Sequence, residues 1–148
     1  MKKLFIGLLL SVFAFMPLHS WASNSCTAKT ALPITLWGST TVTPVECTLD
    51  TIDTTTGTTI YTPASSNMAA IVGLAYAEDT AITVSFVDGT DVQPRFEMGA
   101  NSGFTQGVGA SLFFPAQPGN AIKVQNSAAF TSGIMFWVIE AQRFVKNY

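Results

Sequence analysis

Apolar and polar residues alternate strictly in the segment 82–86, which reads ITVSF. This two-residue period is typical of a β-strand with one buried face. The pair Asp88-Gly89 follows, and such a pair favours the two-residue turn of a β-hairpin. Pro94 interrupts the returning strand. Because proline donates no hydrogen bond to a sheet, we expect that strand to lie at an edge or to carry a bulge.

Further short apolar runs follow one another along the chain, with residues that favour turns between them. The runs cover 34–42, 58–62, 69–76, 109–114, 121–125 and 133–141. Short strands at nearly regular spacing predict an all-β fold, an antiparallel β-sandwich or jelly roll. Only the segment 66–77 has a helical alternative, because good helix formers follow a potential cap at Ser66 or Asn67. We favour a strand there.

The last run, GIMFWVIEA at 133–141, is apolar in both alternating sets of positions. It is either a central strand covered on both faces, or a strand with one face against another subunit. The second alternative makes this region a candidate subunit interface. The candidate interface residues are Gly133, Ile134, Phe136, Val138, Phe144 and Tyr148.

The N-terminus has the pattern of a secretory signal peptide. Two lysines precede an apolar run, and the small residues Ser20 and Ala22 flank Trp21. The run 4–18 has 15 residues, fewer than the roughly 20 that cross a bilayer. We therefore expect cleavage after Ala22, a single domain at 23–148, and no transmembrane anchor in the mature protein. The mature chain would be secreted, periplasmic or on the surface of a bacterial cell.

The two cysteines, Cys26 and Cys47, follow this leader closely. Cysteines in an oxidising compartment normally pair, so we expect a disulfide. His19 would be removed with the leader, and it is the only histidine. A zinc site or a thiol nucleophile is therefore disfavoured, because each needs further imidazole or thiol groups.

Charge argues against nucleic-acid binding. The segment after Ala22 keeps five of the seven basic residues and all nine acidic ones, so its formal charge is near −4. Nucleic-acid sites need clustered cations, which this segment lacks.

Catalytic and metal-binding patterns are also weak. Ser-His and Cys-His pairs cannot form without an imidazole, so we expect no enzymatic activity of that kind and no cofactor. A pair of carboxylates for glycosidase chemistry is an open alternative, but sequence does not bring two together. Asp88 and Asp91 offer oxygen ligands for calcium. We favour a turn role for the DG pair and expect no metal.

Aromatic residues are the remaining candidates for binding. Trp37 and Phe104 are the candidate ligand contacts, because aromatic rings stack on sugars and contact proteins. Phe104 lies in a segment rich in Gly, Ser and Asn, which we interpret as an exposed loop.

Residues 84–141 resemble the second half of small jelly-roll proteins found on phage and virus particles. The resemblance lies in the P-G-x-A-I-x-V pattern at 118–124, followed by a small-residue turn and a last apolar strand that ends at Glu140. It implies an oligomeric jelly roll. A fainter similarity to chaperone-usher pilins lies in one disulfide, Gly133, the run 134–139 and Tyr148, and it implies assembly by strand exchange.

Two hypotheses of function follow. The first is a non-enzymatic, exported structural subunit of a filament, coat or virion-like oligomer, which contacts copies of itself through a β-edge or an apolar sheet face. The alternative is a secreted β-sandwich that binds a glycan, a surface receptor or another ligand through its loops.

Overall fold

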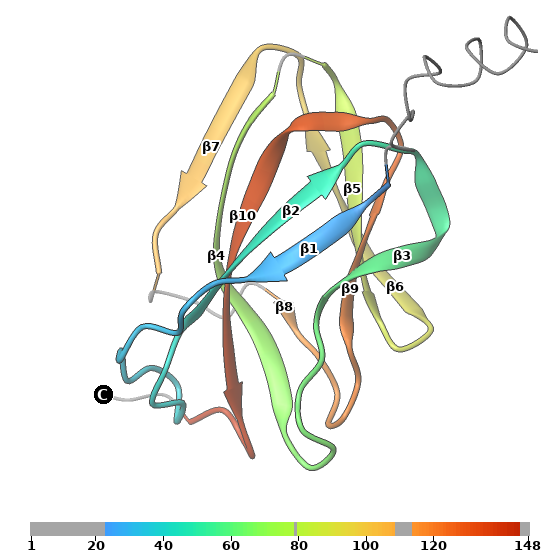
Figure 1. Ribbon diagram of the computed structural model, residues 1–148. Coiled ribbons are helices and arrows are strands. Elements are labelled where there is room, and N and C mark those ends of the chain that lie inside the picture. Colours follow the sequence, from blue (N-terminus) through green and yellow to red (C-terminus); the bar gives the residue numbers. More distant parts are fainter. Residues whose placement is uncertain (1–22, 79, 109–113, 146–148) are drawn as a thin grey trace, which may run out of the picture.

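β-Strands form the regular structure of the described chain, residues 23–78, 80–108 and 114–145 of the computed structural model (Figure 1). No helix occurs within these three ranges, so the helical alternative at 66–77 is wrong. The strands are β1 (Ser25–Ala28), β2 (Thr43–Leu49), β3 (Asp53–Tyr61), β4 (Met68–Glu78), β5 (Ile82–Asp88), β6 (Asp91–Met98), β7 (Ser102–Gln106), β8 (Phe114–Pro115), β9 (Ile122–Asn126) and β10 (Phe130–Ala141).

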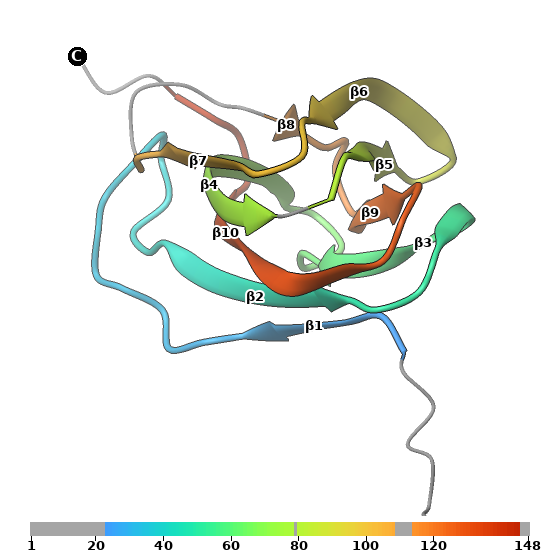
Figure 2. The ribbon, with the colours of Figure 1, turned by 90° about the horizontal axis from the view of Figure 1, so that it is seen from above.

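The two halves of the chain pair with one another in nested order. The hairpin β5–β6 is at the centre of the chain, and outward from it β4 pairs with β7, β3 with β9 and β2 with β10, all antiparallel. This ribbon is rolled into two sheets with the orders β1-β2-β10-β4-β7, where β8 also pairs with β4, and β3-β9-β5-β6. The two sheets enclose a common interior (Figure 2). The predicted sandwich is confirmed as a jelly roll.

The predicted hairpin forms with its turn one residue later than expected. Asp88 pairs with Asp91, so Gly89 and Thr90 are the two turn residues. Gly89 has a φ of 62°, as the first central position of such a turn requires. Pro94 lies in β6, at the edge of its sheet, as predicted.

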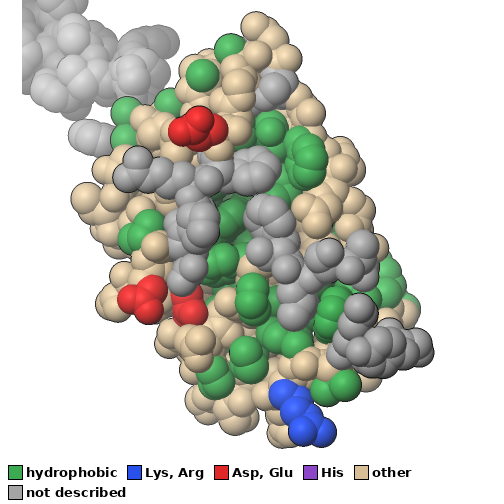
Figure 3. Space-filling view, turned by 180° about the vertical axis from the view of Figure 1, so that it is seen from behind, with side chains coloured by type: hydrophobic (Ala, Val, Ile, Leu, Met, Phe, Trp, Pro, Cys, Tyr) green, Lys and Arg blue, Asp and Glu red, His purple; other side chains and the backbone are tan. Residues whose placement is uncertain are grey.

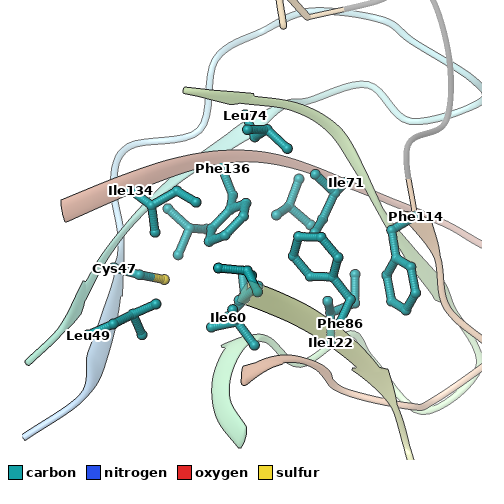
Figure 4. Close-up of a cluster of buried hydrophobic side chains, with 14 of the residues drawn as sticks. Cys47, Leu49, Ile60, Ile71, Leu74, Phe86, Phe114, Ile122, Ile134 and Phe136 are labelled. Carbon is teal, nitrogen blue, oxygen red and sulfur yellow. The ribbon is translucent and has the colours of Figure 1, made fainter. Parts of the chain in front are cut away.

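Apolar side chains from both sheets fill the interior (Figure 4). Phe86 and Phe136 meet edge to face, with ring centroids 5.7 Å apart. A fully buried phenylalanine such as Phe136 stabilises the fold by about 3–5 kcal/mol relative to alanine. Three candidate interface residues, Ile134, Phe136 and Val138, belong to this core and are at most 2% exposed. Placing them at a subunit interface was wrong, because β10 directs them into its own domain.

The outer face of β10 is covered in part, around Ile139, by other segments of its own chain. Val42, Ala70, Val72 and Ile139 form a second buried cluster on that face. Leu36, Trp37, Val108, Trp137 and Phe144 pack against this cluster. β10 is therefore a central strand between β2 and β4, buried on its inner face and covered in part on its outer face, where Met135 stays partly exposed. This is closer to the first of the two alternatives.

Gly133 shapes β10 from within. The register between β10 and β2 shifts between Phe130 and Ile134, and Gly133 in this bulge has a φ of 79°. Glycine adopts this φ without the steric cost that a side chain brings. Its role is thus conformational.

The disulfide is confirmed, and it joins two adjacent strands. Cys26 of β1 and Cys47 of β2 are directly opposite in the antiparallel register. Asn24 adds a second attachment, since its Nδ2 donates to the carbonyl of Thr51 at 2.9 Å and its Oδ1 accepts from the Thr51 amide at 2.8 Å. The first described residues are thereby fixed to the sandwich.

Some predicted elements differ from the structure. The run 34–42 is a loop with isolated bridges instead of a strand. Phe104 lies in strand β7, which pairs with β4, so its segment is not entirely loop. Of the predicted strand 109–114, only Phe114 lies within the described residues, as part of β8.

Candidate functional site

The loop between β1 and β2 contains a tight turn at Trp37. Leu36 and Ser39 exchange two backbone hydrogen bonds of 2.9 Å across Trp37 and Gly38. Both turn residues have positive φ, 53° for Trp37 and 87° for Gly38. This combination is typical of a type I′ turn, which prefers Asn, Asp or Gly at its first central position. A bulky aromatic residue there costs about 1–3 kcal/mol of strain.

The C-terminal segment holds this turn in place. The Val145 amide donates to the Trp37 carbonyl at 3.1 Å. A Cβ atom at Gly38 would lie 3.1 Å from the Arg143 carbonyl, so the two segments approach closely. Leu32 and Val42 also exchange backbone hydrogen bonds of 2.7 and 2.9 Å. The loop is therefore fixed at both its ends and its tip.

The Trp37 indole adds a second cost. Its Nε1 is buried and has no hydrogen-bond partner within the described residues. A buried donor without a partner costs about 1–3 kcal/mol. The packing of the Trp37 ring on the outer cluster must outweigh both this loss and the strain of the turn.

Aliphatic side chains are exposed around Trp37. Leu32, Ile34 and Val145 are 40%, 39% and 45% exposed. We define the loop–tail surface as Leu32, Ile34, Leu36, Trp37, Phe144 and Val145. Large apolar side chains gathered on a surface are typical of contact sites. The loop carrying most of these residues lies beside the C-terminal segment (Figure 1).

The structure places one candidate ligand contact next to one candidate interface residue, and it separates the two candidate ligand contacts from each other. Trp37, a candidate ligand contact, and Phe144, a candidate interface residue, pack on the same outer cluster. Phe104 is 40% exposed, as expected, but it stacks on Tyr76, which packs against the interior core. Trp37 and Phe104 therefore lie on opposite faces of one sheet. Tyr148 lies outside the described residues.

Glu140 binds three groups of its own chain. Its carboxylate accepts from the Tyr61 hydroxyl at 2.6 Å, the Ala64 amide at 2.9 Å and Asn67 Nδ2 at 2.7 Å. Burial raises the pKa of Glu140, but these hydrogen bonds outweigh it and the pKa lies below its usual value. Burial and the bond to Glu140 raise the pKa of Tyr61 to about 12. The hydrogen bond between Tyr61 and Glu140 therefore joins the two sheets.

Asp88, a candidate calcium ligand, is 6% exposed and similarly engaged. Its Oδ2 accepts from the Gln117 amide at 2.9 Å, and its Oδ1 accepts from Asn120 Nδ2 at 2.8 Å. These bonds attach the β5–β6 hairpin to the loop before β9. Within the described residues, no three His, Cys, Asp or Glu side chains are grouped as a metal site requires.

The loop–tail surface as a unit was missed in the sequence. The apolar residues Leu32, Ile34 and Leu36 alternate with Pro33 and Thr35, and this pattern resembles that of a strand. The signals against a strand are Pro33 and Gly38, which favour an irregular segment. The loop's exposure and its contact with the C-terminal segment depend on the fold.

Charged side chains are sparse among the described residues on the face seen from behind (Figure 3). They lie towards its margins, while hydrophobic side chains are visible nearer its middle. In the part of the chain that the structure describes, no helix has the length and hydropathy needed to span a bilayer. No protein family, curated protein or solved structure matches this chain.

Proposed function

We propose that this protein is a non-enzymatic, exported structural subunit that assembles with copies of itself through the loop–tail surface. The observation that carries the proposal is the exposure of Leu32, Ile34 and Val145 on a segment fixed by hydrogen bonds. Burying such side chains on association is favourable by roughly 25 cal/mol per Å² of apolar area.

Rigidity supports the same function. The loop is closed by the disulfide between Cys26 and Cys47, and its tip is bonded to the C-terminal segment. A surface that is already ordered loses little conformational entropy on binding. Backbone strain such as that of the Trp37 turn gathers at functional sites. The Trp37 indole nitrogen, which is buried without a partner among the described residues, adds a further cost.

The proposal differs from the initial expectation in the surface used. The inner face of β10 is buried in the interior and the outer cluster covers part of its outer face, which favours a contact elsewhere. β10 is paired on both sides by strands of its own chain, so it has no free edge for a donated strand. In this proposal the contact lies on the loop–tail surface and not on β10.

The test is the oligomeric state of the mature protein and of Ile34→Asp and Leu32→Asp. We expect light scattering to show oligomers for the wild type and at least a tenfold weaker association for each variant, because a carboxylate would be buried at the contact. Ile52→Asp is the matched control. Ile52 is 65% exposed and lies at the opposite end of β2, so its replacement should not alter association.

Two results would contradict the proposal. One is a wild-type protein that remains strictly monomeric at millimolar concentration. The other is dissociation by Ile52→Asp to the same extent as by Ile34→Asp, which would show that added charge alone disrupts the assembly.

A further inference from the structure

The residues 142–145, which follow β10, form a short segment that is weakly attached to the rest of the molecule. We call it the tail segment. Gln142, Arg143 and Val145 are exposed, and Phe144 is half-buried. Among the described residues, one backbone hydrogen bond joins this segment to the loop between β1 and β2, from the Val145 amide to the Trp37 carbonyl at 3.1 Å. Exposed segments with few hydrogen bonds open locally at a low cost in free energy, while the rest of the fold stays intact.

Trp37 bears two costs as long as the tail segment holds its turn. Its backbone has a φ of 53°, and its indole Nε1 is buried without a hydrogen-bond partner among the described residues. Strained conformations persist only where the surrounding structure imposes them. In an open turn, Trp37 would return to a negative φ and its Nε1 would donate to water. Opening therefore relieves both costs in one step.

Apolar packing keeps the turn closed. Trp37 and Phe144 both pack on the outer cluster, and both are half-buried there. Beneath this cluster, β10 is paired with β4 from Ile134 to Ala141. This ladder includes neither the tail segment nor the Trp37 turn, so both can detach while the sheet remains paired.

We infer that the tail segment is a latch, which opens and closes together with the Trp37 turn and without unfolding of either sheet. The closed form is the one that the structure contains. Two residues of the loop–tail surface, Phe144 and Val145, belong to the latch, and Trp37 lies in the turn that the latch holds. Opening therefore removes half of the surface through which we propose that copies associate.

The role of the latch in assembly rests on the proposed function. A second copy that binds only the closed form shifts the equilibrium towards closure, by as much as its affinities for the two forms differ. Closure of the latch and association therefore favour each other.

Hydrogen exchange followed by NMR tests whether the tail segment and the turn open together. The mature wild type is measured at a concentration at which it is monomeric, and Trp137→Phe identifies the indole resonance of Trp37. We expect the protection factors of the Val145 amide and the Trp37 indole N–H to agree within about threefold, because one opening exposes both. The Val42 amide, which donates to the Leu32 carbonyl at 2.9 Å, is the internal control. It should be at least about tenfold more protected than either group, since it lies outside the latch.

A matched pair of variants tests the hydrogen bond and its effect on assembly. Val145→Pro removes the amide that donates to Trp37, whereas Val145→Ala keeps this amide and shortens only the side chain. Relative to Val145→Ala, we expect Val145→Pro to exchange the Trp37 indole hydrogen at least about tenfold faster and to associate at least about tenfold more weakly. The melting temperatures of both variants should stay near that of the wild type, because the tail segment contributes no strand to either sheet.

Four results would overturn the inference. They are a difference in protection between Val145 and Trp37, protection of both groups equal to that of Val42, equal association of Val145→Pro and Val145→Ala, and a large fall in the melting temperature of Val145→Pro. The last result would mean that the tail segment supports the whole fold. A wild type that never associates refutes the proposed function, while the exchange at Val145 and Trp37 still decides whether the latch exists.

Discussion

Glu140 shows how one side chain connects the two sheets. It lies on β10, while Tyr61 is the last residue of β3 in the other sheet. The three hydrogen bonds that its carboxylate accepts also fix the loop after β3, through Ala64 and Asn67. Hydrogen bonds to charged groups contribute more than neutral ones, about 1.5–3 kcal/mol each.

We expect Glu140→Gln to lower the free energy of unfolding by about 1–3 kcal/mol at pH 7. The pKa of Glu140 in the folded protein lies below its usual 4.5, so the contribution of the carboxylate is present above about pH 4.5. It is lost as the pH falls through the folded-state value. The difference between wild type and variant should therefore shrink in acid. Urea unfolding measured between pH 7 and pH 3 checks this.

Glu46→Gln is the matched control for this measurement. The Glu46 carboxylate forms a 2.7 Å ion pair with Lys29, but both side chains are about half exposed. Exposed ion pairs contribute about 0–1 kcal/mol, so this variant should remain close to wild type at every pH. A constant difference for Glu140→Gln across the range would contradict the proposed role of its charge.

Trp37 was recognisable as a candidate contact from its residue type, but its conformation was not. Nothing in the sequence requires a tryptophan to adopt a φ of 53° when most turns of this kind use Asn or Gly. The conformation depends on Val145, more than 100 positions later in the chain, which bonds to the Trp37 carbonyl. Local sequence propensities carry no information about such long-range contacts.

Strands with regular alternation could be predicted, and irregular ones could not. β4, β5, β9 and β10 were expected near their actual positions, because their apolar periods are clear. β2 was missed, although Val45, Cys47 and Leu49 alternate inward. β7 has no apolar period at all and forms because β4 offers it a free edge. Its pairing partner, not its composition, makes it a strand.

β1 depends on the disulfide more than any other strand does. It pairs only with β2, and most of its residues are exposed. We expect Cys26→Ala combined with Cys47→Ala to lower the free energy of unfolding by at least about 3 kcal/mol, as the chain-entropy estimate gives for a loop of this length. Chemical denaturation of the variant against the wild type measures the difference.

Lys29→Ala serves as the control, because its ion pair with Glu46 also links the end of β1 to β2 but is exposed. We expect a loss of no more than about 1 kcal/mol. If the double cysteine variant is equally mild, the ladder and the Asn24 hydrogen bonds alone hold β1, and the disulfide has another purpose.

From the sequence, the class of fold could be predicted but the full strand topology could not. Turn chemistry and short strands indicate a sandwich, but they do not specify that β2 pairs with β10. That pairing joins residues about 90 positions apart, such as Val45 and Phe136. It is selected by the burial of both strands in one interior, which no local pattern encodes.

The assembly that we propose should respond to salts as an apolar contact does. We expect oligomers to persist in 1 M sodium chloride and to strengthen in sodium sulfate, because excluded salts favour apolar burial. Sedimentation velocity across both salts measures this. Dissociation in sodium chloride would indicate screened charges at the contact instead, and the loop–tail surface would then be the wrong one.

The nested pairing of the strands also governs when the protein can fold. A chain that emerges N-terminus first, from a ribosome or across a membrane, presents β2, β3 and β4 long before their partners β10, β9 and β7 arrive. The sheet β3-β9-β5-β6 lacks a strand until β9 is delivered, and the sheet β1-β2-β10-β4-β7 lacks its central strand until β10 is delivered. Delivery of β10 is therefore the step that completes the jelly roll.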